Sequence, residues 1–585
     1  MKKYLSNYWK AFLTVLFGVA VFLFWRYVYP FALSYQEQFQ LFQSGDSYFM
    51  ERIALPGGLV RYVAEFLVQF YYYLVFGSII LAVLFVLIQL LTWLLMKRQM
   101  PGMKDNADFL YPLSFLPVLS LWYLLGDENV LLGYVVALAF GLLFMWLYPK
   151  KQLARIVFCL VGIPLIYWLI GPMVLMTALY IAVVEWQDGK IKGWLGIGMG
   201  IVSVLLALLC ILVSAWFLPY PLLRLFSGIG YYRGVQMLPL LMYLIPLMVI
   251  ILICLSHLSF RVSGKKAFWP AIITVCVIVL AGFFVPKGYD EKKYDLMEYD
   301  YLVRSKDWNG VIAKSEKRMP DLPMSVCATN LALAMNNQLG NRAFEFYQRG
   351  VEGLLPPFDR NPVSVQLTGE VYYYLGLINT AQRFAFESME ALPDYNKSAR
   401  AVKRLVETNL INGEYSVARK YAEILRKTFC YRGWAEKMED LMTDEKRIDA
   451  HSLYGWLRQI RLQEDFLFSE DEVDKICGQL FMRNPKNVMA TQYLLLCPLL
   501  NRDIPLFMQY VQVVQGQQNY NPRSCQEAIA FAFAQNNQQP PQGVVSPVIL
   551  KSLSDFGRIV SNSGTNAPEL EAYRSTVWYY LMKGQ

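Results

Sequence analysis

Carboxylate and arginine side chains recur in the polar segments between the apolar runs of residues 1–285. Carboxylates take up protons as general bases, and guanidinium groups hold phosphate, so their convergence would permit proton transfer beside a bound anion. The charged residues that we predict on one side of these runs are Glu37, Asp46, Glu51, Glu65, Asp127, Glu128, Arg26, Arg52, Arg61, Arg224 and Arg233. The alternative is that these residues are helix caps, solvated faces and local ion pairs.

The composition is that of a membrane protein joined to a soluble helical region. Hydrophobic residues make up 56% of the 585 residues and charged residues 17%, which is too apolar for an ordinary soluble protein. Before Pro286 there are 19 Lys/Arg and 10 Asp/Glu, and after it 35 of each, so the net charge of +9 belongs to the apolar half. We read these cations as topology signals and expect no nucleic-acid partner.

Eight apolar runs are candidate membrane spans, because a span needs about 20 apolar residues. They cover residues 11–29, 66–96, 109–125, 130–148, 156–184, 194–217, 237–258 and 268–285. The fifth run contains Gly171-Pro172 and is either one span or a hairpin of two short arms. The hairpin divides the Lys/Arg residues 14 to 5 between the two sides, and one straight helix divides them 11 to 8. The positive-inside rule favours the hairpin, and hence nine spans rather than eight.

This topology places the N-terminus in the cytoplasm of a bacterial inner membrane and everything after Pro286 on the periplasmic side. The large external loop is residues 30–65. Tyr35, Phe39 and Phe42 share one face at helical spacing, which predicts a short helix in the outer interface with Glu37 pointing away from the rings. Asp46 is a candidate cap of the next helix, and Pro56-Gly57-Gly58 predicts a turn.

Few other residues offer chemistry. Nine cysteines without a C-x-x-C pair and two histidines argue against a structural zinc site. The glycines between 196 and 200 lie inside a span and predict close helix packing. Glu185 ends a span beside Trp186, where its side chain can reach the interface.

Residues 286–535 read as stacked helix pairs. Two similar glycine-and-alanine patterns recur 37 residues apart, and Asp307 and Asn487 stand at further helix starts. The positions in the two patterns are Gly376, Ala381, Ala385, Gly413, Ala418 and Ala422. They resemble the tetratricopeptide repeat, in which the glycine permits the turn and the alanines let helices pack closely. The resemblance implies an α-solenoid that binds a protein or peptide; the alternative is a cap that packs on the membrane half.

Residues 536–585 form a Gln/Pro-rich linker followed by a terminal helix near 569–582.

The external loop after a first span resembles the polytopic glycosyltransferases that use lipid-linked sugar donors. The resemblance implies that an external acid acts as base or metal ligand, so Glu37 and Asp46 are the candidate catalytic residues and a divalent cation is a candidate cofactor. The candidate substrate-binding residues, for the donor phosphate, are Arg52, Arg61, Arg224 and Arg233. The adjacent acidic pair common in that family is absent, because Glu37 and Asp46 are nine residues apart.

The stretches PGGLVRYVAEFLVQFYYYLVFG and DYLVRSKDWNGVIAKSEK resemble an uncharacterised family of bacterial polytopic membrane proteins. We therefore predict an all-α protein with a membrane domain (1–285), a tetratricopeptide-like α-solenoid (286–535) and a terminal segment (536–585). Two functions stay open. One is a glycosyltransferase-like enzyme acting on a lipid-linked donor at the outer face, and the other is a non-catalytic membrane-anchored scaffold whose repeats bind envelope proteins.

Overall fold

The computed structural model describes residues 2–100, 107–188, 194–234, 237–258, 268–356, 362–394, 396–463 and 472–584, and over these ranges the fold is all-helical without a named strand. Six cations of the topology argument lie outside the described residues: Lys104, Lys190, Lys192, Arg261, Lys265 and Lys266. The chain forms two compact units. The first contains residues 1–294, 392–399 and 427–432, and the second contains 295–391, 400–426 and 433–585.

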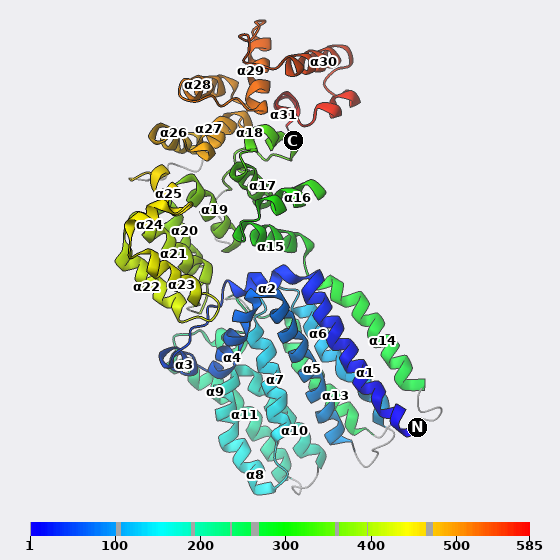
Figure 1. Cartoon of the computed structure of the whole chain (residues 1–585). Coiled ribbons are helices and arrows are strands. Elements are labelled where there is room, and N and C mark those ends of the chain that lie inside the picture. The colour runs from blue at the N-terminus through cyan, green and yellow to red at the C-terminus, as the bar shows by residue number, and fades with distance from the viewer. Residues whose placement is uncertain are drawn as a thin grey trace. The chain divides into compact units, whose positions relative to one another are not determined.

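The first unit is a bundle of apolar helices with short helices at one end (Figure 1). Its helices are α1 (Lys2–Leu23), η1 (Phe24–Val28), α2 (Pro30–Glu37), α3 (Asp46–Ile53), α4 (Gly58–Val68), η2 (Gln69–Tyr72), α5 (Leu74–Gln99), η3 (Ala107–Phe115), α6 (Leu116–Leu124), α7 (Leu132–Leu147), α8 (Gln152–Val157), η4 (Phe158–Gly162), α9 (Ile163–Ile170), η5 (Gly171–Met173), α10 (Val174–Asp188), α11 (Trp194–Phe217), α12 (Leu222–Ser227), α13 (Leu240–His257), α14 (Phe268–Phe284) and η6 (Val285–Lys287).

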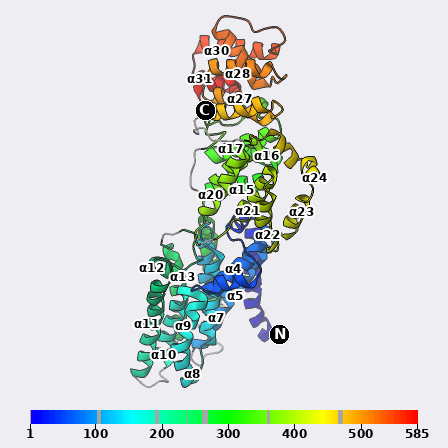
Figure 2. The same cartoon turned by 90° about the vertical axis from the view of Figure 1, so that its left-hand side faces the viewer.

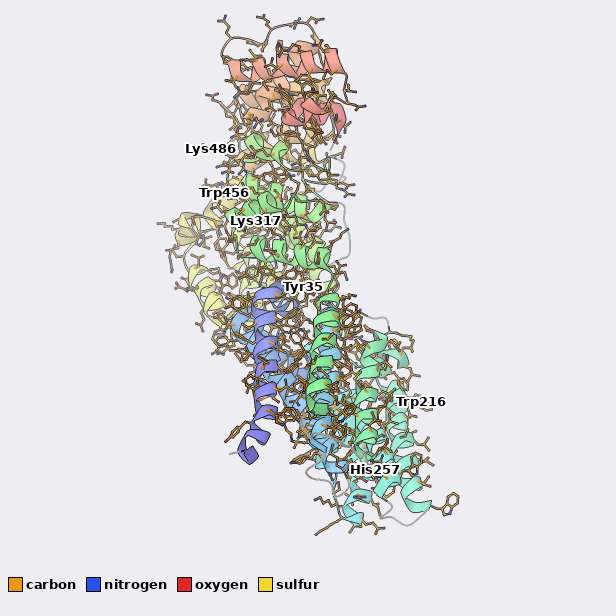
Figure 3. The ribbon with its side chains drawn as sticks, turned by 90° about the vertical axis from the view of Figure 1, so that its right-hand side faces the viewer. Tyr35, Trp216, His257, Lys317, Trp456 and Lys486 are labelled. Carbon is orange, nitrogen blue, oxygen red and sulfur yellow. The ribbon has the colours of Figure 1, made fainter. Side chains whose placement is uncertain are left out.

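Six helical stretches of the described chain are long and apolar enough to cross a membrane. They are Tyr8–Val28, Leu74–Gln99, Gln152–Gln187, Gly196–Phe217, Leu240–His257 and Trp269–Lys287, and Phe109–Leu124 and Leu132–Leu147 are shorter apolar helices. Trp216 is 88% exposed and points away from the bundle, and Tyr35 and His257 lie at opposite ends of it (Figure 3). An exposed apolar surface of this kind suits a hydrocarbon environment rather than water.

The stretch Gln152–Gln187 reverses direction at Gly171-Pro172, as the sequence predicts. Gly171 has a positive φ of 67°, a conformation that favours glycine. Arg155 Nη1 lies 2.8 Å from Glu185 Oε1, whereas these residues would be about 45 Å apart along one straight helix. The two arms therefore run antiparallel, and α10 packs against α11 (Figure 2).

Two expectations about these helices are wrong. Glu185 does not reach the interface, because its side chain is buried and also accepts a hydrogen bond from Tyr148; a buried carboxylate requires such partners. The second long helix begins at Leu74 rather than at residue 66, since Tyr73 adopts an extended conformation that separates α4 and η2 from α5.

The loop predicted to be external, residues 30–65, folds into α2, α3 and the start of α4, and it is not an exposed interfacial helix. Tyr35, Phe39 and Phe42 are at most 5% exposed, and Glu37 is 3% exposed rather than solvent-facing. The helix ends at Glu37, and the predicted turn before Gly58 is confirmed, with Gly57 in the left-handed conformation.

The second unit consists of consecutive helices that pack on one another. They are α15 (Glu291–Arg304, whose first turn lies in the first unit), α16 (Trp308–Lys317), α17 (Pro323–Met335), α18 (Leu339–Arg342), η7 (Ala343–Glu345), α19 (Pro362–Leu375), α20 (Ile378–Glu390), α21 (Ala399–Asn412), α22 (Tyr415–Arg426), α23 (Arg432–Leu441), α24 (Glu445–Ala450), α25 (Tyr454–Ile460), α26 (Val473–Arg483), α27 (Val488–Leu500), α28 (Ile504–Gln515), α29 (Arg523–Gln535), α30 (Pro547–Ser563), η9 (Pro568–Tyr573) and α31 (Val577–Lys583).

The residues of the predicted repeats have the expected local roles. Gly376 and Gly413 have φ of 99° and 85° at the ends of α19 and α21, and Asp307 and Asn487 cap α16 and α27 through their side chains. The four repeat alanines are buried. The terminal segment differs from expectation because α30 precedes the last helix, and α28, α30 and α31 gather at one end of this unit (Figure 2).

Candidate functional site

Glu65 on α4 is the centre of the charges contributed by the external loop. Its carboxylate accepts hydrogen bonds from Arg52 Nε (2.8 Å), Arg61 Nε (2.9 Å) and Tyr48 Oη (2.6 Å). Arg61 lies four residues earlier on the same helix, so the two side chains share one face. Arg52 and Tyr48 reach Glu65 because the turn at Gly57 folds α3 back against α4.

This group of side chains is almost fully withdrawn from solvent. The side chains of Arg52 and Arg61 are 4% exposed and that of Glu65 is 3% exposed. Burial alone would raise the pKa of Glu65, but the charges of Arg61 and Arg52 outweigh burial and lower the pKa below its usual value. Glu65 is therefore a charged structural partner of both arginines.

Arg61 also binds a segment from far along the sequence. Its Nη2 donates to the backbone oxygen of Asp394 at 2.7 Å and to Asn396 Oδ1 at 2.9 Å. Arg224 forms an ion pair with the Asp394 carboxylate, and both side chains are at most 5% exposed. Residues 392–399 belong to the first compact unit together with these arginines.

Glu37 holds the second such segment, residues 427–432. Its Oε1 accepts a hydrogen bond from Tyr431 Oη at 2.7 Å, and Ser44 donates through both N and Oγ to Lys427 O at 2.7 Å. The neighbouring Cys430 thiol donates to Gln69 O at 3.3 Å. Burial and the charge of Glu37 raise the pKa of this thiol to about 12, so it is a packing residue.

Asp46 and Arg233 have different surroundings. Asp46 is the exposed first residue of α3, and Gly45 occupies the cap position that the sequence predicts for Asp46. Arg233 donates to Asn129 Oδ1 and to Tyr35 Oη, and its guanidinium lies 4.6 Å from the centre of the Phe39 ring. Arg233 has no carboxylate partner among the described residues.

The structure thus links three of the six candidate site residues through shared partners and separates the other three. Arg52 and Arg61 share Glu65, and Arg61 and Arg224 share the loop at Asp394, whereas Glu37 contacts Tyr431 elsewhere. Over the described residues no cluster of three or more His, Cys, Asp or Glu side chains could hold a metal ion. The arrangement is therefore suited to holding chain segments together.

Sequence reasoning missed the partners of these residues. The i,i+4 spacing of Arg61 and Glu65 is a readable signal of their pairing. Asp394 and Asn396 lie more than 300 positions from Arg61, and Tyr431 lies more than 300 positions from Glu37. Local sequence pattern carries no information over such a separation.

The fold and these contacts define a protein that is all-helical over its described residues, with six candidate membrane helices among them, in which the segment 30–65 binds two loops from residues 392–399 and 427–432. A family model covers residues 6–584, nearly the whole chain, and the protein belongs to this family, described as a family of unknown function (DUF6057). No curated protein and no solved structure matches the chain.

Proposed function

We propose that this protein is a non-catalytic, membrane-anchored interaction protein. The observation that carries the proposal is that the predicted catalytic acid Glu37 and the buried arginines bind the protein's own chain. A general base must reach the proton that it removes, and Glu37 is 3% exposed with a tyrosine hydroxyl on its carboxylate. This observation favours the scaffold over the glycosyltransferase-like enzyme and its lipid-linked donor.

The external segment acts in this proposal as a clamp, defined as Glu37, Ser44, Arg61 and Arg224 with the loops 392–399 and 427–432. Both loops belong to the first unit, although the residues on either side of each loop belong to the second.

A groove among the C-terminal helices is the proposed binding surface for a partner. It has a volume of about 1020 Å³ and lies between α29, α30 and α31 and the Gln/Pro-rich segment before α30. None of the described residues that line it is charged; Phe531 and Phe556 supply rings, and Gln535, Gln538 and Gln542 supply amides. Apolar walls with amide groups suit an uncharged, extended peptide, whose backbone the amides can hydrogen-bond.

The proposed orientation is a cytoplasmic N-terminus, about nine spans and a periplasmic C-terminal half in the bacterial inner membrane. It is supported by the distribution of basic residues in the first unit. Arg98 donates to the backbone oxygens of Trp146 and Tyr148, and Arg155 to that of Pro149, so these arginines gather at one end of the bundle. The two arginines of the clamp that pair with carboxylates, Arg61 and Arg224, lie on α4 and α12. An excess of cations on one side is the usual topology signal.

Filling the groove is expected to release the partner. Gly557 lines the groove, and a Cβ added there meets no atom within 4 Å, so Gly557→Leu occupies the groove without strain. A photo-crosslinking residue placed at Val548, which is 76% exposed on α30, should capture the partner in cells that carry the full-length chain. The leucine should lower this crosslink about tenfold, equivalent to the loss of one well-packed contact.

The matched control is Gly433→Leu, because Gly433 is also an exposed helical glycine with no atom within 4 Å of an added Cβ, and it does not line the groove. An equal crosslink in Gly557→Leu and Gly433→Leu would contradict the proposal. A changed glycan profile in Glu37→Gln/Asp46→Asn at normal protein level would favour the enzyme instead.

A further inference from the structure

An apolar groove of about 720 Å³ runs between α1 with η1, α6 and α14 in the first unit. Among the described residues that line it none is charged, and only Tyr27, Trp122 and Thr274 carry polar side-chain atoms. The Thr274 hydroxyl donates a hydrogen bond to the backbone oxygen of Pro270 at 2.7 Å and therefore needs no other acceptor. The helices α1 and α14 lie side by side (Figure 1).

The groove lies along helices that are candidate membrane spans. The stretch Trp269–Lys287 is only 11% buried within the protein, and Val275 and Val279 are 59% and 64% exposed. Lipid therefore has access to the groove from the side of α14. In hydrocarbon there is no water to satisfy a polar group, so each such group needs a partner from the protein or from lipid.

Trp122 presents one polar group without a partner. The residue is 8% exposed, lines the groove, and its indole N–H has no hydrogen-bond acceptor among the described residues. Its ring is held edge-on by Phe17 and Phe24, with centroids 6.0 and 5.3 Å away. A buried N–H without an acceptor is costly, which points to an acceptor oxygen supplied by a ligand.

Two cations mark one end of the groove. Val28, Val285 and Pro286 line this end, and Arg26 and Lys287 neighbour them in sequence. Neither cation forms an ion pair over the described part of the chain. Arg26 lies over the Tyr27 ring at 5.2 Å, and Lys287 lies over the Phe283 ring at 3.6 Å.

Trp122 lies near the same end. It stands two residues before the end of α6, and a Cβ added at Gly126 would lie 2.2 Å from the backbone oxygen of Gly288, the residue after Lys287. The chain segments that carry the indole N–H and the two cations therefore meet where the groove leaves the spanning helices, and the Arg26 guanidinium lies over Tyr27, a residue that lines the groove.

We propose that the groove binds one anionic phospholipid. An acyl chain lies between α1 and α14, an ester oxygen accepts the hydrogen bond of Trp122 Nε1, and Arg26 and Lys287 hold the phosphate. Along the groove, apolar walls are followed by an N–H donor and then by cations. This order matches that of the acyl chain, ester and phosphate in such a lipid. An apolar transmembrane helix of a partner could pack against the walls, but it would not supply the acceptor oxygen and the anionic group that the N–H donor and the cations require.

The test is native mass spectrometry of the full-length protein in detergent, titrated with phosphatidylglycerol or with phosphatidylcholine of the same acyl chains. We expect one saturable phosphatidylglycerol, bound at least about fivefold more tightly than phosphatidylcholine, because the net charge of the headgroup adds one attraction. Arg26→Gln/Lys287→Gln should remove this preference. Trp122→Phe, which keeps the ring and loses the N–H, should weaken both lipids about fivefold, as one hydrogen bond does.

Gly282→Leu tests the groove itself, because Gly282 lines it and an added Cβ meets nothing within 4 Å. This variant should abolish saturable binding, while the matched control Gly198→Leu on α11, also open around its Cβ, should bind as the unaltered protein does. Equal binding by the Gly282 and Gly198 variants would overturn the proposal. Loss of a dimer, rather than of lipid, in Gly282→Leu would also overturn it in favour of a partner helix.

Discussion

Replacing Glu65 with glutamine is expected to lower the free energy of unfolding by about 3–5 kcal/mol, which is the usual effect of removing one partner from a buried ion pair. The substitution leaves Arg52 and Arg61, each 4% exposed, without their shared charge. Tyr48 also loses its carboxylate acceptor. The measurement is chemical unfolding of the full-length protein in detergent, followed by the fluorescence of its tryptophans.

Glu51→Gln is the matched control for this prediction. Glu51 pairs with the same arginine, Arg52, at 2.9 Å, but its side chain is 61% exposed. Exposed pairs contribute at most about 1 kcal/mol, so this variant should unfold almost as the unaltered protein does. Equal effects of Glu51→Gln and Glu65→Gln would show that the group around Glu65 is not buried in the folded protein.

Acid is expected to destabilise the second unit through Glu370. Burial alone would raise the pKa of Glu370, but Arg404 and Arg400 outweigh burial and lower the pKa from 4.5 to about 2. The folded pKa is below the unfolded one, so the stabilisation is complete above pH 4.5 and is lost as the pH falls towards 2. The difference corresponds to about 3 kcal/mol. Unfolding curves of the full-length protein between pH 6 and pH 2 measure it.

Glu370→Gln should remove this pH dependence while lowering stability at neutral pH, because Arg400 and Arg404, whose side chains are 9% and 14% exposed, lose their shared carboxylate. Glu387→Gln is the comparison, since Glu387 pairs with Arg383, whose side chain is 61% exposed. That variant should keep the acid-dependent loss. An unchanged pH profile in Glu370→Gln would contradict the assignment.

Much of the membrane half could be predicted because hydropathy and length act locally. Residues 194–217 form α11 with the predicted bounds, and the chain reverses at Gly171-Pro172 as the charge distribution favours. The left-handed glycines of the second unit, Gly376 and Gly413, follow equally from local steric rules.

The environment of the candidate site could not be predicted in the same way. The sequence identifies Glu37 and Arg61 as notable charges, but whether such residues face solvent depends on what packs over them. Here the covering residues come from 392–399 and 427–432, and only tertiary structure brings these segments to the external loop. For the same reason Glu185 is buried against Arg155 instead of reaching the interface.

A double-mutant cycle between Arg224 and Asp394 tests most directly the claim that the buried charges of the first unit hold the protein's own chain. Arg224→Gln, Asp394→Asn and the double variant are compared by unfolding of the full-length protein; asparagine suits the positive φ of 60° at position 394. The clamp predicts a coupling energy of about 1.5 kcal/mol or more, because the pair is buried. Additive effects within about 0.5 kcal/mol would contradict the clamp and leave Arg224 free to bind a ligand.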